Sequence, residues 1–504
     1  MKVSLLVFSF LLVLFATITV PAQSETPTLK DLNGFFPLKV PDSLDAWEER
    51  AALLRRRVLL ANGLFPLPER TPLNAVVHGK IKRPGFTVEK VYFESVPGFH
   101  VTGLLFRPAG ENARPGARYP AVLSPHGHGG RLMDLGEEGV LKKIETGSEK
   151  FVDSGRFPKV ARCVTLARLG CVTLLYDMIG YADNQQLSRE LGHGFKNQRP
   201  DFEGKESWGL YSAQAEMRLQ SIFGIQTWNS VRALDFLGSL PDVDSKRIAV
   251  TGGSGGGTQT IMICAIDDRP VVAFPNGMVS SSMQGGCTCE NASLLRIGTG
   301  NVELAALYAP RPQGMTAAND WTKEMLIEGK GFPELKAVYG LYGKPENVIC
   351  GDLLRFPHNY NYVTRRIMYE WFNKHLGLGH ETPIVEEDFA HLTAEEHAVY
   401  DKGDHPRPEG GDAFERELTR WLADESDRQL GSLSAGERNE LVRQAWQTIV
   451  GIDDPIAPAG EANWIKTTRS GGETTITLSA PPVMEETPVV NNKREFAGYT
   501  HGYN

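Results

Sequence analysis

Cysteine is scarce in this chain of 504 residues, which has six, at positions 163, 171, 264, 287, 289 and 350. So few thiols in so long a chain exclude a small disulfide scaffold, and their even number leaves three bridges, one bridge or none open. Cys287 and Cys289 form a C-x-C pair, but no second C-x-C or H-x-H pair accompanies it. We therefore expect no structural zinc and no other metal site.

Clusters of positive charge are also lacking. The 53 Lys and Arg residues are outnumbered by 61 Asp and Glu residues, which gives a net charge of −8 spread along the chain. This pattern excludes nucleic acid and anionic membrane surfaces as partners. The apolar content of 41% and charged content of 23% are those of a soluble globular protein. The length predicts one large domain with appended structure.

Long apolar runs are absent except at the N-terminus. Residues 3–20 are almost entirely apolar and follow Lys2, and Val20 and Ala22 are small residues at the positions that a signal peptidase reads. We predict a signal peptide over residues 1–22, a secreted or periplasmic location, and no membrane contact after cleavage. An uncleaved anchor is the alternative, because the run reaches the lower edge of a membrane span.

The rest of the chain alternates strand-like and helix-like segments. A helix is predicted from Ser43, which is a suitable N-cap, and another over residues 160–169. The strands are predicted over residues 86–96, 99–106, 119–123, 172–177, 271–274, 308–316 and 348–354. Alternation of strands and helices at this spacing predicts a mostly parallel, doubly wound sheet with helices on both faces.

The most specific motif is GGSGG at residues 252–256, which fits G-x-S-x-G. A β-branched strand precedes it and a helix follows, as in a nucleophile elbow, where a sharp turn exposes a serine. A phosphate loop is the alternative for such a glycine-rich turn, but no G-K-[ST] follows. We predict that Ser254 is the nucleophile and that the N–H of Gly255 contributes to an oxyanion hole, helped by the dipole of the following helix.

A second glycine-rich loop, SPHGHGG at residues 124–130, follows a predicted strand. An H-G-x-G-G loop can direct a backbone N–H at an oxyanion, and here we predict the N–H of His128 in this role. A loop with two surface histidines is the alternative. The presence of Ser254 favours the oxyanion hole.

An acid and a base follow later in the chain. Asp320 lies in a loop after a predicted strand, and His358 lies just beyond the next strand. The order Ser254, Asp320, His358 is the chain order of α/β-hydrolase triads, in which the histidine takes the serine proton and the acid orients the histidine. The rival acids are Asp352, Glu303 and Glu290.

These motifs together resemble the α/β-hydrolase superfamily, and within it the acetyl xylan esterase-like carbohydrate esterases, over residues 44–376. The resemblance is carried by SPHGHG at 124–129, TGGSGGG at 251–257, YAPRP at 308–312 and FPHNYN at 356–361. It implies an α/β-hydrolase fold and a serine esterase that needs no cofactor and acts on an acylated carbohydrate. Gly255 stands where acetyl xylan esterases often have Gln and glucuronoyl esterases have Arg.

We predict that three insertions build the substrate pocket, because each follows a strand and open α/β sheets bind ligands at the carboxyl ends of their strands. These insertions are residues 131–158, 182–221 and 277–300. Tyr181 and Trp208 are candidates to stack on sugar rings, although packing within a lid is the alternative. Glu290 is a candidate for a polar substrate contact.

The predicted organisation is a signal peptide (1–22), an α/β-hydrolase domain (23–376), a helical extension (377–451) and a short β-containing tail (452–504). The tail ends in FAGYTHGYN, which also resembles the start of a truncated second hydrolase-like domain. The alternatives to a deacetylating esterase are a uronoyl or pectin methyl esterase, a serine peptidase of the same fold and a carbohydrate-binding pseudo-hydrolase. The sequence leaves the oligomeric state open.

Overall fold

The computed structural model describes residues 34–114, 116–194, 197–358, 360–450, 465–470 and 473–478. The predicted signal peptide and most of the predicted tail therefore lie outside the described residues. Within the described part of the chain, no helix is both long enough and apolar enough to cross a membrane.

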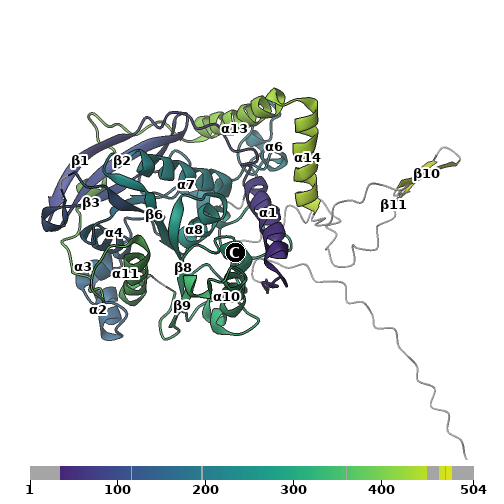
Figure 1. The fold of residues 1–504 in the computed structure, drawn as a ribbon. Helices are drawn as coiled ribbons and strands as arrows, with labels where there is room; N and C mark the ends of the chain where they lie inside the picture. Colours follow the sequence, from purple (N-terminus) through teal and green to yellow (C-terminus); the bar gives the residue numbers. More distant parts are fainter. Residues whose placement is uncertain are drawn as a thin grey trace, which may run out of the picture.

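A nine-stranded mixed sheet with the order β1-β2-β3-β5-β4-β6-β7-β8-β9 forms the centre of the molecule (Figure 1). The strands β1 to β3 form an antiparallel meander, β3 pairs antiparallel with β5, and every pairing from β5 to β9 is parallel. The strands are β1 (Val76–Arg83), β2 (Phe86–Val96), β3 (Phe99–Pro108), β4 (Tyr119–Leu123), β5 (Val172–Tyr176), β6 (Val243–Gly253), β7 (Pro270–Asn276), β8 (Gln313–Ala318) and β9 (Val348–Leu353).

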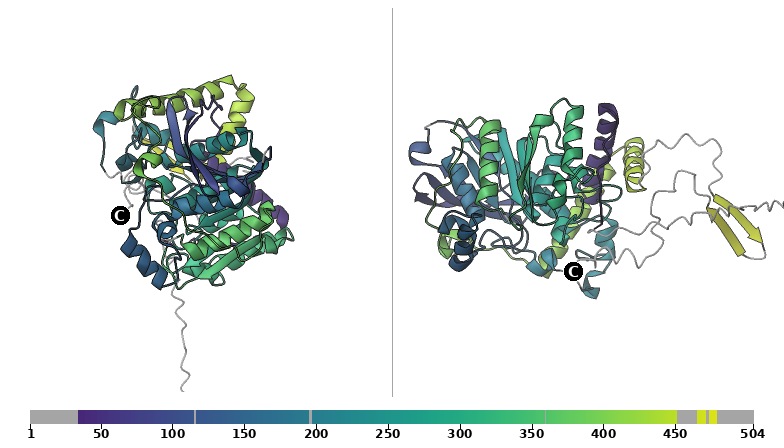
Figure 2. Two further views of the ribbon diagram at one scale, coloured as in Figure 1. Left: turned by 90° about the vertical axis from the view of Figure 1, so that its left-hand side faces the viewer. Right: turned by 90° about the horizontal axis from the view of Figure 1, so that it is seen from below.

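Helices cover both faces of this sheet (Figure 2). The alternation along β4 shows the two faces: Leu123 packs in one apolar cluster with Trp228 of α7, whereas Val122 packs in another with Met368 of α11. The longer helices around the sheet are α1 (Leu44–Ala61), α4 (Pro158–Arg168), α7 (Ile222–Ser239), α8 (Gly255–Ile266), α10 (Phe332–Leu341) and α11 (Tyr362–Leu376). The predicted doubly wound α/β sheet is confirmed.

Shorter helices occupy the connections. The short α-helices are α2 (Glu137–Glu145), α3 (Val152–Arg156), α5 (Arg189–His193), α6 (Ala213–Met217) and α9 (Asn301–Ala306), and the 3-10 turns are η1 (Gly110–Asn112), η2 (Pro200–Phe202), η3 (Thr288–Glu290), η4 (Lys323–Leu326) and η5 (Pro345–Asn347). Ser43 caps α1 as predicted, since its hydroxyl accepts a hydrogen bond from the N–H of Ala46 at 3.2 Å.

The chain beyond α11 first runs as an irregular segment against the body of the molecule and then forms α12 (Ala394–His397), α13 (Asp412–Ser432) and α14 (Ala435–Val450). A buried ion-pair cluster anchors this segment: Arg365 of α11 lies 2.9 Å from Glu149 and 2.7 Å from Glu386. These three helices lie within the predicted helical extension, and β10 (Ile465–Ser470) pairs with β11 (Glu473–Leu478) as an antiparallel hairpin.

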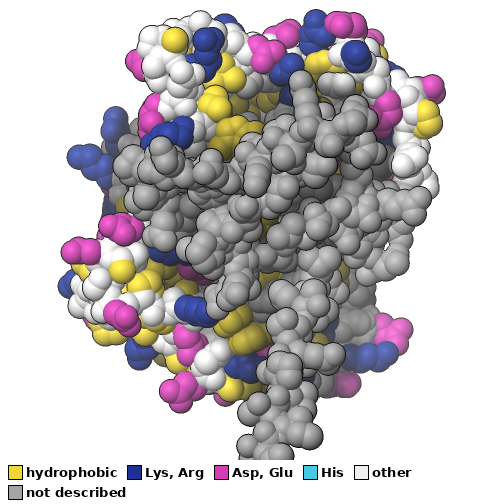
Figure 3. Space-filling model, turned by 90° about the vertical axis from the view of Figure 1, so that its right-hand side faces the viewer, with side chains coloured by type: hydrophobic (Ala, Val, Ile, Leu, Met, Phe, Trp, Pro, Cys, Tyr) yellow, Lys and Arg dark blue, Asp and Glu magenta, His cyan; other side chains and the backbone are white. Residues whose placement is uncertain are grey.

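Figure 3 shows one face of the molecule, on which the acidic and basic side chains of the described residues alternate rather than gather by sign. The visible described part of this face therefore offers no extended patch of one charge.

Candidate active site

Ser254 lies at the turn between β6 and α8. Its backbone has φ 55° and ψ −129°, a conformation that L-residues rarely adopt and that a nucleophile elbow requires. Its N–H donates to the carbonyl oxygen of Asn276 at 3.0 Å. A Cβ on Gly252 would lie 2.3 Å from the carbonyl oxygen of Gly256, so the turn can close only with glycine at that position. The predicted strand, turn and helix are all present.

His358 and Asp320 meet beyond the carboxyl ends of β9 and β8. His358 Nδ1 lies 2.7 Å from Asp320 Oδ2, and the Asp320 side chain is only 5% exposed. Thr322 donates to Asp320 Oδ1 from its N–H at 2.6 Å and from its hydroxyl at 2.5 Å. Burial raises the pKa of Asp320, but the hydrogen bonds from His358 and Thr322 outweigh it and leave this pKa below its ordinary value. The ionised carboxylate is thus placed to hold the proton on His358 Nδ1.

Gly277, directly after β7, lies between the His358 ring and the Ser254 turn. A Cβ at this position would lie 2.8 Å from His358 Cε1 and 3.6 Å from the backbone nitrogen of Ser254. Trp321 packs against the imidazole with ring centroids 4.4 Å apart, and its Nε1–H donates to the carbonyl oxygen of Gly277 at 2.6 Å. The roles of Gly277 and Trp321 were not predicted, because neither residue belongs to a recognisable motif.

The rival acids have other contacts. Asp352 is exposed on β9 and accepts a hydrogen bond from the N–H of Leu354 at 3.2 Å. Glu303 forms an ion pair with Arg50 at 2.9 Å, and Glu290 accepts from a glycine N–H within its own turn. Among the described carboxylates, Asp320 is the one within hydrogen-bonding distance of His358.

The loop after β4 lies directly over Ser254. A Cβ on Gly127 would be 2.9 Å from Ser254 Cβ and 3.1 Å from the nitrogen of Gly255. The N–H of Gly255 is in the first turn of α8, where a helix leaves its N–H groups without intrahelical acceptors. The segments that carry the two N–H groups predicted for the oxyanion hole, those of Gly255 and His128, are therefore neighbours in space.

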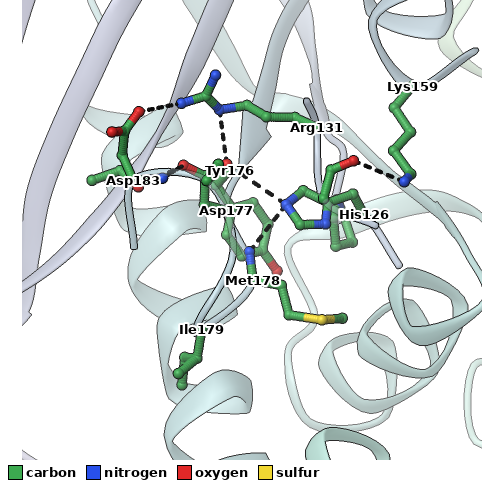
Figure 4. A network of polar contacts seen from close by, with 12 residues as sticks. His126, Arg131, Lys159, Tyr176, Asp177, Met178, Ile179 and Asp183 are labelled. Carbon is green, nitrogen blue, oxygen red and sulfur yellow. Dashed lines mark hydrogen bonds and ion pairs between the residues drawn. The ribbon is translucent and has the colours of Figure 1, made fainter. Parts of the chain in front are cut away.

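A buried polar network supports this loop (Figure 4). Arg131 Nε donates to Asp177 Oδ1 at 2.8 Å, and its Nη2 donates to Asp183 Oδ2 at 2.6 Å. His126 Nε2 accepts from the N–H of Met178 at 3.2 Å, while burial lowers the pKa of His126 and favours its neutral form. Asp177 and Asp183 therefore order this loop through Arg131.

Lys159 of α4 holds the same loop from the other side. Its Nζ donates to the carbonyl oxygens of His128 at 3.0 Å and Gly130 at 2.8 Å. Burial lowers the pKa of Lys159 to about 7. Neither Lys159 nor Arg131 was predicted as a supporting residue, because each lies well separated in sequence from the group it holds.

The three candidate substrate residues lie in different surroundings. The ring of Tyr181, 7% exposed, lies 4.6 Å from that of His193 and 6.4 Å from that of His128. Glu290 is 2% exposed, and a Cβ on Gly255 would lie 3.4 Å from its Oε1. Trp208 instead packs in a small cluster with Ala215 and Ala423 of α13, and its Nε1–H donates to Gln220. The structure thus brings Tyr181 near the loop after β4 and Glu290 near Gly255. Trp208 lies elsewhere, because the insertion that carries it packs against α13.

All six cysteines belong to the described residues, and each is a free thiol. The C-x-C pair lies beside two histidines that its spacing did not indicate. Cys289 Sγ lies 3.4 Å from His128 Nε2, and Cys287 Sγ lies 3.5 Å from His193 Nδ1. These four ligand atoms all lie within 4.8 Å of one another. Motif spacing could not show this cluster, because the two histidines precede their sulfur partners by 161 and 94 residues.

Comparison with known proteins agrees with this architecture. The family described as "Acetyl xylan esterase (AXE1)" matches residues 170–276. The solved structure of methylesterase BT1017 superposes with a TM-score of 0.53 at 25% sequence identity, over 76% of this chain and 78% of that one. Residues 170–276 match the acetyl xylan esterase family, and the fold is that of an α/β-hydrolase. The resemblance drawn from its motifs is confirmed.

Two further matches are partial. The acetyl esterase Axe7A of Xylanibacter ruminicola is 42% identical over 55 residues, which are 11% of this chain and 12% of that protein. The glucuronoyl esterase from Solibacter usitatus has a TM-score of 0.44 at 18% identity, over 70% of this chain and 100% of that one. The chain therefore spans only a small part of the curated acetyl esterase that it matches. The family match over residues 170–276 and the match to methylesterase BT1017 support a carboxylic ester hydrolase as the class of enzyme.

Proposed function

We propose that this α/β-hydrolase is a secreted serine esterase that removes acetyl groups from carbohydrates, with Ser254 as nucleophile, His358 as base and Asp320 as its orienting acid. The observation that carries the proposal is the 2.7 Å contact between His358 Nδ1 and the buried Asp320 carboxylate, beside the strained turn of Ser254. A positioned acid, an imidazole and a serine on an elbow are the parts needed to activate a hydroxyl group.

The reaction follows from these positions. His358 accepts the Ser254 proton on Nε2 as Oγ attacks the ester carbonyl, and then returns it to the leaving sugar hydroxyl. The N–H groups of Gly255 and His128 stabilise the oxyanion, with the N-terminus of α8 behind them. Water then attacks the acyl-enzyme by the same route, so the reaction needs no cofactor.

The surroundings of Gly255 favour a small, uncharged acyl group. A Cβ at this position would lie 2.8 Å from Met178 Cε and 3.4 Å from Glu290 Oε1, so the space in which a longer side chain would extend is occupied. No cation follows the nucleophile to bind a sugar acid. Each extra methylene in a tight slot costs about 1–3 kcal/mol, so we expect kcat/KM to fall steeply from acetyl to butyryl esters.

Methyl-ester hydrolysis is the second candidate, because the structure of methylesterase BT1017 superposes over 76% of this chain. In that reaction a uronic acid is the acyl group and methanol leaves. Deacetylation and methyl-ester hydrolysis would use the same three residues, Ser254, Asp320 and His358. They differ in the acyl group of the substrate that would lie beside Gly255.

The test is a comparison of products. The purified enzyme is incubated with acetylated xylan and with methyl-esterified pectin, and acetate and methanol are quantified against a Ser254→Ala control. We expect acetate release, together with labelling of Ser254 by a fluorophosphonate. Methanol without acetate would move the substrate to the second candidate. Absence of both products and of labelling would favour the carbohydrate-binding pseudo-hydrolase, and cleavage of peptides would favour the peptidase.

The proposed organisation keeps the signal peptide over residues 1–22, the catalytic domain over 23–376, the helical extension over 377–451 and the tail over 452–504. A leader of this type fits an enzyme whose substrates are extracellular polysaccharides. N-terminal sequencing of the protein exported by its host tests cleavage after Ala22, and a mature chain that still begins at Met1 would contradict it.

A further inference from the structure

We propose that His128, His193, Cys287 and Cys289 bind one zinc ion, and that this ion ties the loop after β4, which carries His128, to α5 and to the η3 turn. The site is separate from the predicted triad and does not depend on the identity of the ester. It rests on the positions of four side chains from three separate segments.

The donor set and its dimensions fit zinc. Two cysteines and two histidines are a common set of ligands for structural zinc, with Zn–S bonds of about 2.3 Å and Zn–N bonds of about 2.0–2.1 Å. A tetrahedral ion with these bonds separates a sulfur from a nitrogen ligand by about 3.6 Å. The observed S–N distances are 3.4 Å for Cys289 and His128 and 3.5 Å for Cys287 and His193.

The histidine that lies beside Cys287 is oriented for a metal. His193 Nε2 lies 2.6 Å from the carbonyl oxygen of Ile179, which makes Nε2 the protonated nitrogen and leaves the Nδ1 lone pair facing the cysteines. Metal-bound histidines usually donate their other N–H in this way, most often to a carboxylate or a backbone carbonyl. Thr288 adds a second link, because its hydroxyl donates to the carbonyl oxygen of Gly192 at 2.7 Å.

The cluster is also enclosed. Cys287 is 5% exposed and Cys289 is fully buried, so neither thiol is placed as a solvent-facing nucleophile. Four protein ligands and no open position are typical of structural rather than catalytic zinc. Binding requires deprotonated sulfur, so loading of the site would release the thiol protons.

The ligands come from three segments, and one of them lies directly over Ser254. His128 belongs to the loop over Ser254, His193 to α5, Cys289 to the η3 turn, and Cys287 is the N-cap of that turn. The next residue, Glu290, approaches Gly255. Because the side chain of His128 would bind the ion, its backbone N–H would be held at the oxyanion position. The ion would therefore support catalysis without touching the substrate.

Metal analysis tests the site directly. The full-length enzyme, purified without chelators and after incubation with equimolar zinc, is gel-filtered and its metal content measured by mass spectrometry. We expect one zinc per chain, loss of that zinc in the double variant Cys287→Ser/Cys289→Ser, and full retention in the control Cys350→Ser. Cobalt(II) added to the metal-free wild type should give the visible absorption of a tetrahedral site with thiolate ligands, a readout independent of esterase activity and of any variant.

Several results would overturn the proposal. These are a wild-type chain that retains no zinc and gives no tetrahedral cobalt spectrum, equal zinc in the double variant, or a Cys287–Cys289 disulfide found by peptide mass mapping of the native protein. If zinc is bound, its removal should lower kcat and its return should restore it. If the protein binds one zinc at these residues but hydrolyses no ester, the zinc proposal is supported and the esterase proposal is refuted.

Discussion

Replacement of Asp320 by Asn tests the proposed acid with little change in shape. In the wild type, Oδ2 accepts from His358 Nδ1 at 2.7 Å while Oδ1 accepts two hydrogen bonds from Thr322 at 2.6 and 2.5 Å. Thr322 supplies two donors, so the amide oxygen of the Asn must remain on its side. The amide NH2 group then faces His358.

The expected size of the effect follows from the tautomer. An NH2 group donates to Nδ1, which moves the imidazole proton to Nε2, and Nε2 can then no longer accept the Ser254 proton. This substitution costs roughly 10⁴-fold in kcat in serine hydrolases. Such a loss corresponds to about 5 kcal/mol of transition-state stabilisation, at 1.36 kcal/mol for each factor of ten.

The assay is steady-state hydrolysis of p-nitrophenyl acetate, with kcat and KM measured separately. Asp352→Asn is the matched control, because Asp352 is exposed and lies on β9, and it should retain activity within about twofold. A circular-dichroism melt shows whether each variant folds. If the folded Asp320→Asn variant kept more than about a tenth of wild-type kcat, or if Asp352→Asn were the damaging change, our reasoning would be refuted.

Further outcomes follow from other contacts. Ser254→Ala and His358→Ala should each abolish most turnover, and the double variant should be scarcely slower, because the two act as a unit; additive losses in kcat would contradict this. Gly127→Ala should lower kcat by on the order of 10²-fold, since its Cβ would lie 2.6 Å from the carbonyl oxygen of Gly253 and must displace the loop. Arg365→Ala should lower the free energy of unfolding in urea by about 3–5 kcal/mol, because it leaves two buried carboxylates unpaired; a loss below 1 kcal/mol would contradict this. The pKa of Asp320 lies below its ordinary value, so its contribution to stability is present above pH ~4 and disappears as the pH falls through the lowered pKa. Acid unfolding of Asp320→Asn should therefore depend less on pH than that of the wild type, and identical profiles would contradict the shift.

The sequence predicted the sheet well, and it predicted that Asp320 and His358, which lie 2.7 Å apart, follow two of its strands, because both depend on local signals. The strands β2 and β4 were predicted to the residue, since each is an apolar or alternating run bounded by turn residues. The strand β1 was missed because its sequence, VVHGKIKR, is half polar and none of its residues is fully buried. An edge strand of this kind takes its conformation from its neighbour rather than from its own pattern.

The side chains that hold the loop over Ser254 in place could not be predicted, because their contacts join residues far apart in the chain. Arg131 reaches Asp177 across 46 residues, and Cys289 reaches His128 across 161. No spacing rule relates such positions, and single histidines and arginines are common in loops. Trp208 was predicted to stack on sugar rings because it is an aromatic residue in one of the insertions. In the structure its apolar surface packs against α13 instead.

Arg131 also connects the loop over Ser254 to the part of the chain that follows α11. Its Nη1 donates to the carbonyl oxygen of His397 at 2.8 Å, and Asp183, which pairs with Nη2, accepts from the N–H of Val399 at 2.9 Å. A gene shortened at residue 376 would thus remove both of these partners while leaving every predicted triad residue in place. An expression fragment designed on the motifs alone would therefore lack part of the support of this loop, and a fragment for activity assays should extend beyond Val399.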